Sequence, residues 1–188
     1  AFPDLTMIRM LAGLKQKNTD ALIGGVARVL EESGIVLEDS SSLLKPHLAP
    51  PGTLTRRGLS ASEQADVDYG RPIARRIAAM DIGQTIVVRD RAVLAVEAME
   101  GTDAVIRRAG ELGNRKDLTV IKVSKPRQDM RFDIPVVGIT TLENMIASGA
   151  TALVLDAGRT LLFDKPEAVA AADRNGIAIV ALPPHDGT

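Results

Sequence analysis

The sequence predicts an α/β fold, with a C-terminal mixed α/β domain and a smaller, mainly helical N-terminal part of a second lobe. From Gln84 onward, short apolar runs rich in β-branched residues alternate with segments that have helix-capping residues, as expected for buried strands covered by helices. Before that point, helical spacing and turn-forming residues dominate. With 188 residues and 45% apolar content, the chain can form one well-packed domain or two small ones.

The N-terminal part is predicted to hold one amphipathic helix and a long connection. Apolar side chains recur at helical spacing over residues 18–34, and Gly34 is placed to end the helix. The apolar run 35–37 is a candidate short strand. Serines, prolines and a glycine interrupt residues 39–57, so this stretch is expected to be irregular.

A second helix is predicted to connect the two lobes. Ser60 and Glu63 form a capping box that opens a helix running towards Met80. Pro72 lies inside this helix and is expected to kink it, which would suit a hinge. The predicted division is residues 1–58 for the N-terminal lobe, 59–82 for the connecting helix or hinge, and 83–188 for the C-terminal domain.

The C-terminal domain is predicted to alternate strands and helices. The expected strands are residues 85–88, 93–96, 118–123, 136–139, 152–155, 160–163 and 177–182. The first two flank 89–91 and suggest a hairpin. Thr140 and Glu143 resemble a capping box, and Asp164 stands before an early proline and Glu167. The expected helices are 103–112, 140–148 and one from 164 to near 176.

Composition excludes several classes of protein. There are no cysteines, which rules out disulfides, thiolate zinc sites and a cysteine nucleophile. A net charge of −1 with 2% aromatic residues argues against a nucleic-acid partner. The sequence has neither a run of about 18 to 20 apolar residues nor a secretory signal pattern, so we expect a cytoplasmic protein. His47 and His185 are expected to be surface residues.

Acidic residues gather around a predicted helix N-terminus, where strand 93–96 is followed by residues 97–103. Glu97, Glu100 and Asp103 stand here with Gly101 and Thr102. One interpretation is ordinary capping by Thr102 or Asp103, with the glycine supplying a turn. The other is a phosphate site at the helix N-terminus, with a divalent cation between the carboxylates and the phosphate.

A polar loop, residues 124–133, follows the strand at 118–123 and concentrates charge. The carboxyl ends of strands are the usual ligand sites in open α/β sheets. Lys and Arg can neutralise phosphoryl oxygens, and Asp can hold Mg²⁺ or orient water. The loop could equally be a solvated charged segment, and Asp133 could cap a turn before Pro135.

Four motifs occur in order along the chain. They are Asp81-Ile-Gly-Gln84, Val96-Glu-Ala-Met-Glu-Gly-Thr-Asp103, Lys125-Pro-Arg-Gln-Asp-Met-Arg-Phe-Asp-Ile-Pro135 and Ala157-Gly158. Taken together, they resemble the UDP-2,3-diacylglucosamine diphosphatases of lipid A biosynthesis, in the family that is not calcineurin-like, and the resemblance runs from about residue 14 to residue 182. The chain departs from the family pattern at Asp156, where glutamate is expected.

The resemblance implies hydrolysis of UDP-2,3-diacylglucosamine to 2,3-diacylglucosamine 1-phosphate and UMP, with Mg²⁺ or Mn²⁺ as cofactor. It also implies that the chain lacks the first βα units of the N-terminal lobe, and that lipid lies between the lobes. Peripheral contact with the cytoplasmic face of the inner membrane is expected for such a substrate, and a homodimer is the default expectation for an oligomer.

The hypothesis assigns roles to particular residues. The catalytic residues are Asp129, Asp133, Lys125 and Arg131. The substrate-binding residues are Glu97, Gly101, Thr102, Asp103, Lys122 and Gln128. The metal ligands are Asp129, Asp133, Glu97 and Glu100. The alternatives are another sugar-nucleotide phosphotransferase, a non-catalytic protein that binds lipid-sugar phosphate, and an oligomeric scaffold.

Overall fold

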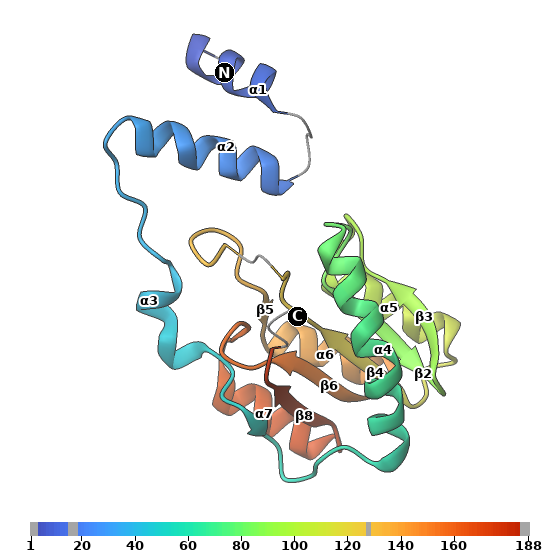
Figure 1. Cartoon of the computed structure of the whole chain (residues 1–188). Coiled ribbons are helices and arrows are strands. Elements are labelled where there is room, and N and C mark those ends of the chain that lie inside the picture. Colours follow the sequence, from blue (N-terminus) through green and yellow to red (C-terminus); the bar gives the residue numbers. More distant parts are fainter. Residues whose placement is uncertain (1–3, 15–18, 127–128, 185–188) are drawn as a thin grey trace.

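A six-stranded mixed sheet forms the centre of the chain (Figure 1), whose computed structural model describes residues 4–14, 19–126 and 129–184. The strand order is β1-β8-β6-β4-β2-β3, and the three central strands β8, β6 and β4 are parallel. The strands are β1 (Gly52–Thr53), β2 (Thr85–Arg89), β3 (Ala92–Val96), β4 (Leu118–Lys122), β6 (Ala150–Asp156) and β8 (Ala178–Leu182). A separate parallel pair consists of β5 (Val136–Val137) and β7 (Leu161–Leu162). The α/β prediction is therefore confirmed.

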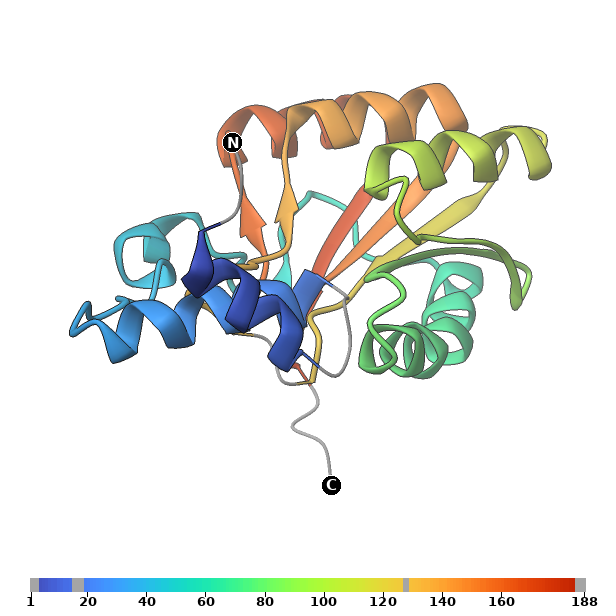
Figure 2. The same cartoon turned by 90° about the horizontal axis from the view of Figure 1, so that it is seen from above.

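Helices cover both faces of the sheet (Figure 2). One face carries α5 (Thr102–Leu112), α6 (Ile139–Ser148) and α7 (Lys165–Arg174), and the other carries α4 (Ala61–Ala79). Side chains alternate between these faces: Val87 and Val120 join the core under α5 and α6, whereas Ile86, Val88 and Ile121 pack under α4. Burial on both faces explains why these strands are almost wholly apolar.

The N-terminal helices lie away from the sheet (Figure 1). They are α1 (Leu5–Gly13) and α2 (Thr19–Glu32), followed by the short α3 (Ser41–Leu44) and the 3₁₀ helix η1 (Lys45–His47). The helix prediction for 18–34 is confirmed, but the strand at 35–37 is wrong. Within the described residues that run pairs with no strand, and Val36 is 81% exposed. Three apolar residues without a neighbouring strand cannot satisfy a ladder of backbone hydrogen bonds.

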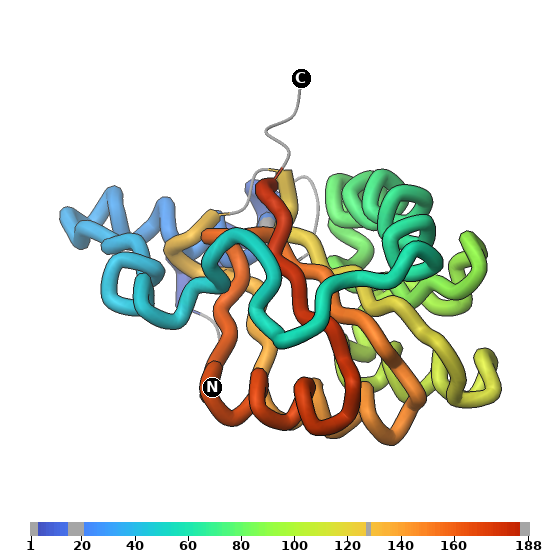
Figure 3. Tube along the Cα trace, turned by 90° about the horizontal axis from the view of Figure 1, so that it is seen from below, coloured from blue at the N-terminus to red at the C-terminus, as the bar shows by residue number. Residues whose placement is uncertain are grey.

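The connection 39–57 is more ordered than expected, since it holds α3, η1 and β1. β1 pairs antiparallel with β8, so the chain passes along that edge of the sheet before it enters α4 (Figure 3). Sequence patterns missed β1 because a two-residue edge strand is specified by its partner and not by periodicity. None of the helices within the described ranges is long and apolar enough to cross a membrane.

The helix α4 confirms the capping box and adds a packing role. Ser60 accepts from the backbone N–H of Glu63, whose carboxylate accepts from the backbone N–H of Ser60. The helix continues past Pro72, and its small residues Ala74 and Ala78 are buried against β2 and β4. It thus packs on the C-terminal sheet, while the domain boundaries at 58 and 82 stay a prediction.

The later elements follow the predicted order, with local corrections. The hairpin β2–β3, the helix α5 and the strand β4 are confirmed. The expected strand 136–139 shortens to β5, because α6 already begins at Ile139 with Gly138 as its N-cap. The Thr140 capping box is therefore wrong. Asp164 occupies the N-cap of α7, but in a left-handed conformation without a side-chain capping bond to the described residues.

Glu63 should make the protein acid-sensitive. Burial raises its pKa, but hydrogen bonds from Arg57, Ser60 and Thr151 outweigh this and lower the pKa to about 2. A shift of this size corresponds to about 3 kcal/mol, and we discount it to about 2 kcal/mol because Arg57 is 36% exposed. Since the folded pKa is depressed, this stability is present above about pH 4.5 and is lost as the pH falls towards about 2.

The check is urea unfolding of the wild type and of Glu63→Gln between about pH 7 and pH 2. The wild type should be more stable at neutral pH, and the difference in unfolding free energy should shrink by about 2 kcal/mol below about pH 4. A difference that stays constant across this range would show that the ionisation of Glu63 does not contribute.

Candidate functional site

A polar pocket of about 280 Å³ opens where β3 and β4 end, beside the segment that links α4 to β2. Its chemically active side chains come from three separate parts of the chain. They are Asp81 and Gln84 after α4, Glu97 after β3, and Lys122, Lys125 and Asp133 at the end of β4 and in the following loop. The structure thus gathers Glu97, Lys122, Lys125 and Asp133, four of the residues predicted from the sequence.

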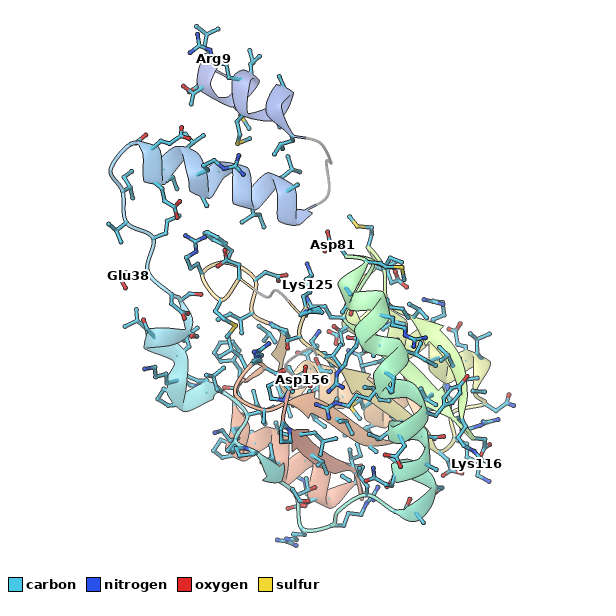
Figure 4. The ribbon with its side chains drawn as sticks, viewed as in Figure 1. Arg9, Glu38, Asp81, Lys116, Lys125 and Asp156 are labelled. Carbon is cyan, nitrogen blue, oxygen red and sulfur yellow. The ribbon has the colours of Figure 1, made fainter. Side chains whose placement is uncertain are left out.

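Lys125 lies between two carboxylates at the pocket. Its Nζ is 2.6 Å from Asp81 Oδ1 and 3.4 Å from Asp133 Oδ2. Figure 4 shows Asp81 and Lys125 side by side near the upper end of α4. Gln84 donates from Nε2 to the same oxygen of Asp133, at 3.3 Å. Lys125 therefore ties the loop after β4 to the segment after α4, and it places a cation inside the pocket.

A second lysine, Lys122, is buried at the pocket floor. Its Nζ donates to Thr102 Oγ1 at 2.6 Å, and Thr102 donates in turn to Glu97 Oε1 at 2.9 Å. The other carboxylate oxygen of Glu97 accepts from the backbone N–H of Gln84 at 3.1 Å. Burial lowers the pKa of Lys122, while the nearby carboxylates of Glu97, Asp133 and Asp103 oppose that shift. A buried ammonium held in this way can stabilise negative charge on a phosphoryl oxygen.

The acidic stretch 97–103 divides between two roles. The N-cap of α5 is Gly101, at a φ of +83° that favours glycine, so neither Thr102 nor Asp103 is the cap. Asp103 accepts from the Thr141 hydroxyl and so joins α5 to α6. Glu100, which precedes α5, pairs with Arg108 on that helix and is not among the residues that line the pocket. Glu97 lines the pocket, and Thr102 connects it to Lys122.

Asp129 and Arg131 lie in the same loop as Asp133 but bind one another outside the pocket lining. The hydrogen bond from Arg131 lowers the pKa of Asp129 and, with the one to Glu31, raises the pKa of Arg131. Arg131 reaches Glu31 on α2, so this pair links the loop to the N-terminal helices. Gln128, predicted to bind substrate, lies outside the described residues.

Behind Lys125, a buried carboxylate fixes the start of the loop. Asp156, at the end of β6, accepts from the backbone N–H of Ser124 at 2.8 Å and from its hydroxyl at 3.0 Å. Its other oxygen accepts from Arg71 on α4 at 2.7 Å. Sequence patterns assigned no role to Asp156 or Arg71, because their contact depends on how α4 packs against the sheet. A buried charged residue at a strand end was the available signal.

The four carboxylates expected to bind a metal do not meet in one place. Within residues 4–14, 19–126 and 129–184, no three acidic or imidazole side chains are arranged to hold a metal ion. Asp133 and Glu97 line the pocket together with Asp81, whereas Asp129 and Glu100 lie outside it. Mg²⁺ is often held by one or two carboxylates with phosphate oxygens and water, and the pocket acids fit that smaller set.

Comparison with known proteins places this site in a family. The model of the LpxI C-terminal domain matches residues 50–180. The chain belongs to the LpxI family. A relative from Caulobacter vibrioides, named UDP-2,3-diacylglucosamine pyrophosphatase LpxI, is 33% identical over 194 residues, which cover 98% of this chain and 69% of the relative. The resemblance inferred from the motifs is thereby confirmed at the level of the family.

The region matched by the LpxI family model contains every residue that lines the pocket, together with Arg71, Ser124 and Asp156. It also contains α4 and β1, the two elements that precede the hairpin β2–β3. The helices α1 and α2 lie before the matched region, although the similarity to the Caulobacter LpxI extends over nearly the whole chain.

Proposed function

We propose that this chain hydrolyses the diphosphate of UDP-2,3-diacylglucosamine to 2,3-diacylglucosamine 1-phosphate and UMP, a step of lipid A biosynthesis. The observation that carries this proposal is the pocket itself, in which two lysines and three carboxylates meet inside the region matched by the family model. The name of the Caulobacter relative supports the substrate. Such a hydrolysis needs lysines that bind phosphoryl oxygens and carboxylates that orient water and accept its proton.

The geometry suggests how the work is divided among the side chains. Lys122 and Lys125 neutralise charge on the phosphoryl oxygens, and the Thr102 hydroxyl, which accepts from Lys122 and donates to Glu97, fixes the position of the Lys122 ammonium. Asp133, kept in place by Lys125 and Gln84, orients the attacking water and accepts its proton. A divalent cation, Mg²⁺ or Mn²⁺, bound by Asp133 with Asp81 or Glu97, would supply Lewis-acid stabilisation of the phosphate charge.

Asp129, Arg131 and Glu100 were predicted to be catalytic residues or metal ligands, but in this proposal their roles are structural. Asp129 and Arg131 hold the shape of the loop and connect it to α2, and Glu100 holds the turn before α5. A cytoplasmic location, peripheral contact with the inner membrane and a homodimer all remain predictions. No observation on the described residues favours the phosphotransferase or the carrier over hydrolysis.

The test is mass spectrometry of the products after incubation with UDP-2,3-diacylglucosamine in water enriched in heavy oxygen. We expect UMP and 2,3-diacylglucosamine 1-phosphate, one of them carrying the label, which identifies the phosphorus attacked. Chelation with EDTA should stop the reaction, and added Mg²⁺ or Mn²⁺ should restore it.

The remaining outcomes separate the alternatives. Transfer of a phosphoryl group to an acceptor other than water, with no heavy oxygen in the products, would indicate a phosphotransferase. Tight binding of the lipid without cleavage would indicate a carrier. Turnover that persists unchanged in EDTA would support the hydrolase and show that the reaction needs no metal ion.

A further inference from the structure

Two arginines lie on successive turns of α4, the helix that leads to Asp81 at the pocket. Residues four apart share one face of a helix, so Arg71 and Arg75 point in the same direction. Arg71 binds Asp156 and the carbonyl oxygens of Leu182 and Pro183, at the carboxyl ends of β6 and β8. Arg75 is one turn nearer to Asp81, the first residue of the pocket lining. In Figure 4, Asp156 lies below Lys125 and Asp81 along this side of the molecule.

Both arginines have buried nitrogen atoms without a partner. In the part of the chain that the structure describes, Arg71 Nε and Arg75 Nη2 are inaccessible to solvent and make no hydrogen bond. Burying such donors costs free energy unless something accepts from them. Burial lowers the pKa of Arg75, as does the positive charge of Arg71, and the charge of Asp156 offsets these effects in part. Among the described residues, each arginine therefore has one buried N–H donor that lacks an acceptor.

The charges around the pair also favour an anion. Asp156 is the carboxylate that Arg71 contacts, and its second oxygen is already used by Ser124. The charge of Asp156 acts on both guanidinium groups, so the two arginines and this carboxylate together carry a net positive charge. Among the described residues, the pocket has the opposite imbalance, because three carboxylates outnumber two lysines there. A ligand with two phosphoryl groups would gain from the additional positive charge of the arginines.

We infer that Arg75, with Arg71 beside it, forms an anion-binding subsite adjoining the pocket, which takes the second phosphoryl group of a diphosphate ligand. The two sites are joined through the chain, since Ser124 binds Asp156 and the next residue is Lys125. The planar guanidinium groups offer paired donors that match phosphate oxygens. That the diphosphate belongs to a sugar nucleotide rests on the proposed function; that an anion binds here does not.

The experiment measures binding without turnover. Calorimetric titration of the full chain with inorganic pyrophosphate and with UMP, in metal-free buffer, is compared for the wild type, Arg75→Gln, Arg75→Lys and Arg76→Gln. Arg76 is the matched control, because it is the next residue of α4 and is exposed. We expect Arg75→Gln to weaken pyrophosphate binding at least tenfold, Arg75→Lys to be intermediate, and Arg76→Gln to stay within about twofold of the wild type.

Thermal melting without ligand separates binding from a structural role. Because Arg75 is a partly buried cation next to another cation, Arg75→Gln should melt at the same or a higher temperature than the wild type. A lower melting temperature for Arg75→Gln, equal losses of affinity in the Arg75 and Arg76 variants, or no pyrophosphate binding by the wild type would each overturn the subsite.

The subsite and the proposed function can fail separately. If the wild type does not hydrolyse UDP-2,3-diacylglucosamine, yet binds pyrophosphate in a way that depends on Arg75, the subsite stands and the function falls. If the wild type hydrolyses the substrate, while Arg75→Gln has unchanged KM and unchanged pyrophosphate affinity, the function stands and the subsite falls.

Discussion

Replacing Asp133 with asparagine is expected to lower kcat by roughly 10²- to 10³-fold while leaving the fold intact. Asparagine has the shape of aspartate but neither its negative charge nor its ability to accept a proton. In the pocket, Asp133 is held by Lys125 and Gln84, so the neutral side chain can still occupy the same position. The loss should therefore appear in turnover and not in the melting temperature.

Asp129→Asn is the matched control for this measurement. Asp129 lies four residues earlier in the same loop, but it binds Arg131 outside the pocket lining. We expect its kcat to fall less than about tenfold, through loosening of the loop. Release of UMP at saturating substrate measures both variants. Normal turnover in Asp133→Asn, with a large loss in Asp129→Asn, would show that the reaction centre lies outside the pocket described above.

The contrast between these two aspartates shows how far sequence patterns could define the site. The loop after β4 was identified as a ligand site because a charged segment follows a buried strand, and the structure places Lys125 and Asp133 at the pocket. Spacing alone could not separate Asp129 from Asp133, because both belong to one irregular loop. Asp133 turns inward through its contacts with Gln84, far away in the sequence, and with Lys125, which Asp81 binds in turn.

The fold shows the same division between local and long-range information. Strongly patterned elements such as β2, β3 and α5 were predicted nearly to the residue, because burial on a sheet or a helix face imposes a period. The two-residue strands β1 and β5 have no period of their own and exist through their partners β8 and β7. The pairing of β5 with β7 ends at Val137, and α6 begins at Ile139 with Gly138 as its N-cap, so Thr140 lies inside the helix and cannot cap it.

Asp81 and Arg71 are two residues whose roles could not be predicted from the sequence. Both reach the site because α4 packs along β2 and β4, and this placement brings residues from before the hairpin to the loop after β4. The motif that begins at Asp81 was recognised as part of a family pattern without a chemical role. The structure adds a reason for it, since Asp81 binds Lys125 and Gly83 lies against the backbone of Glu97.

Gly83→Ala is expected to disrupt both stability and activity, because the pocket is closed by a backbone contact at this glycine. An added Cβ would lie 2.0 Å from the carbonyl oxygen of Glu97 and 2.6 Å from its carbonyl carbon, so the two segments must separate. Separation would break the hydrogen bond from Gln84 N to Glu97 and draw Asp81 away from Lys125. We expect a loss of about 3 kcal/mol in unfolding free energy and at least a 100-fold loss of turnover.

Gly24→Ala provides the control, because this glycine lies within α2 and an added Cβ there has no described atom within 4 Å apart from its own stretch of helix backbone. Alanine favours a helix interior over glycine, so this variant should be as stable as the wild type or more stable, by up to about 1 kcal/mol. Urea unfolding and UMP release are measured on both variants. If Gly83→Ala kept normal stability and turnover, the segment from Asp81 to Gln84 would not be held against Glu97, and the pocket could not owe its shape to that contact.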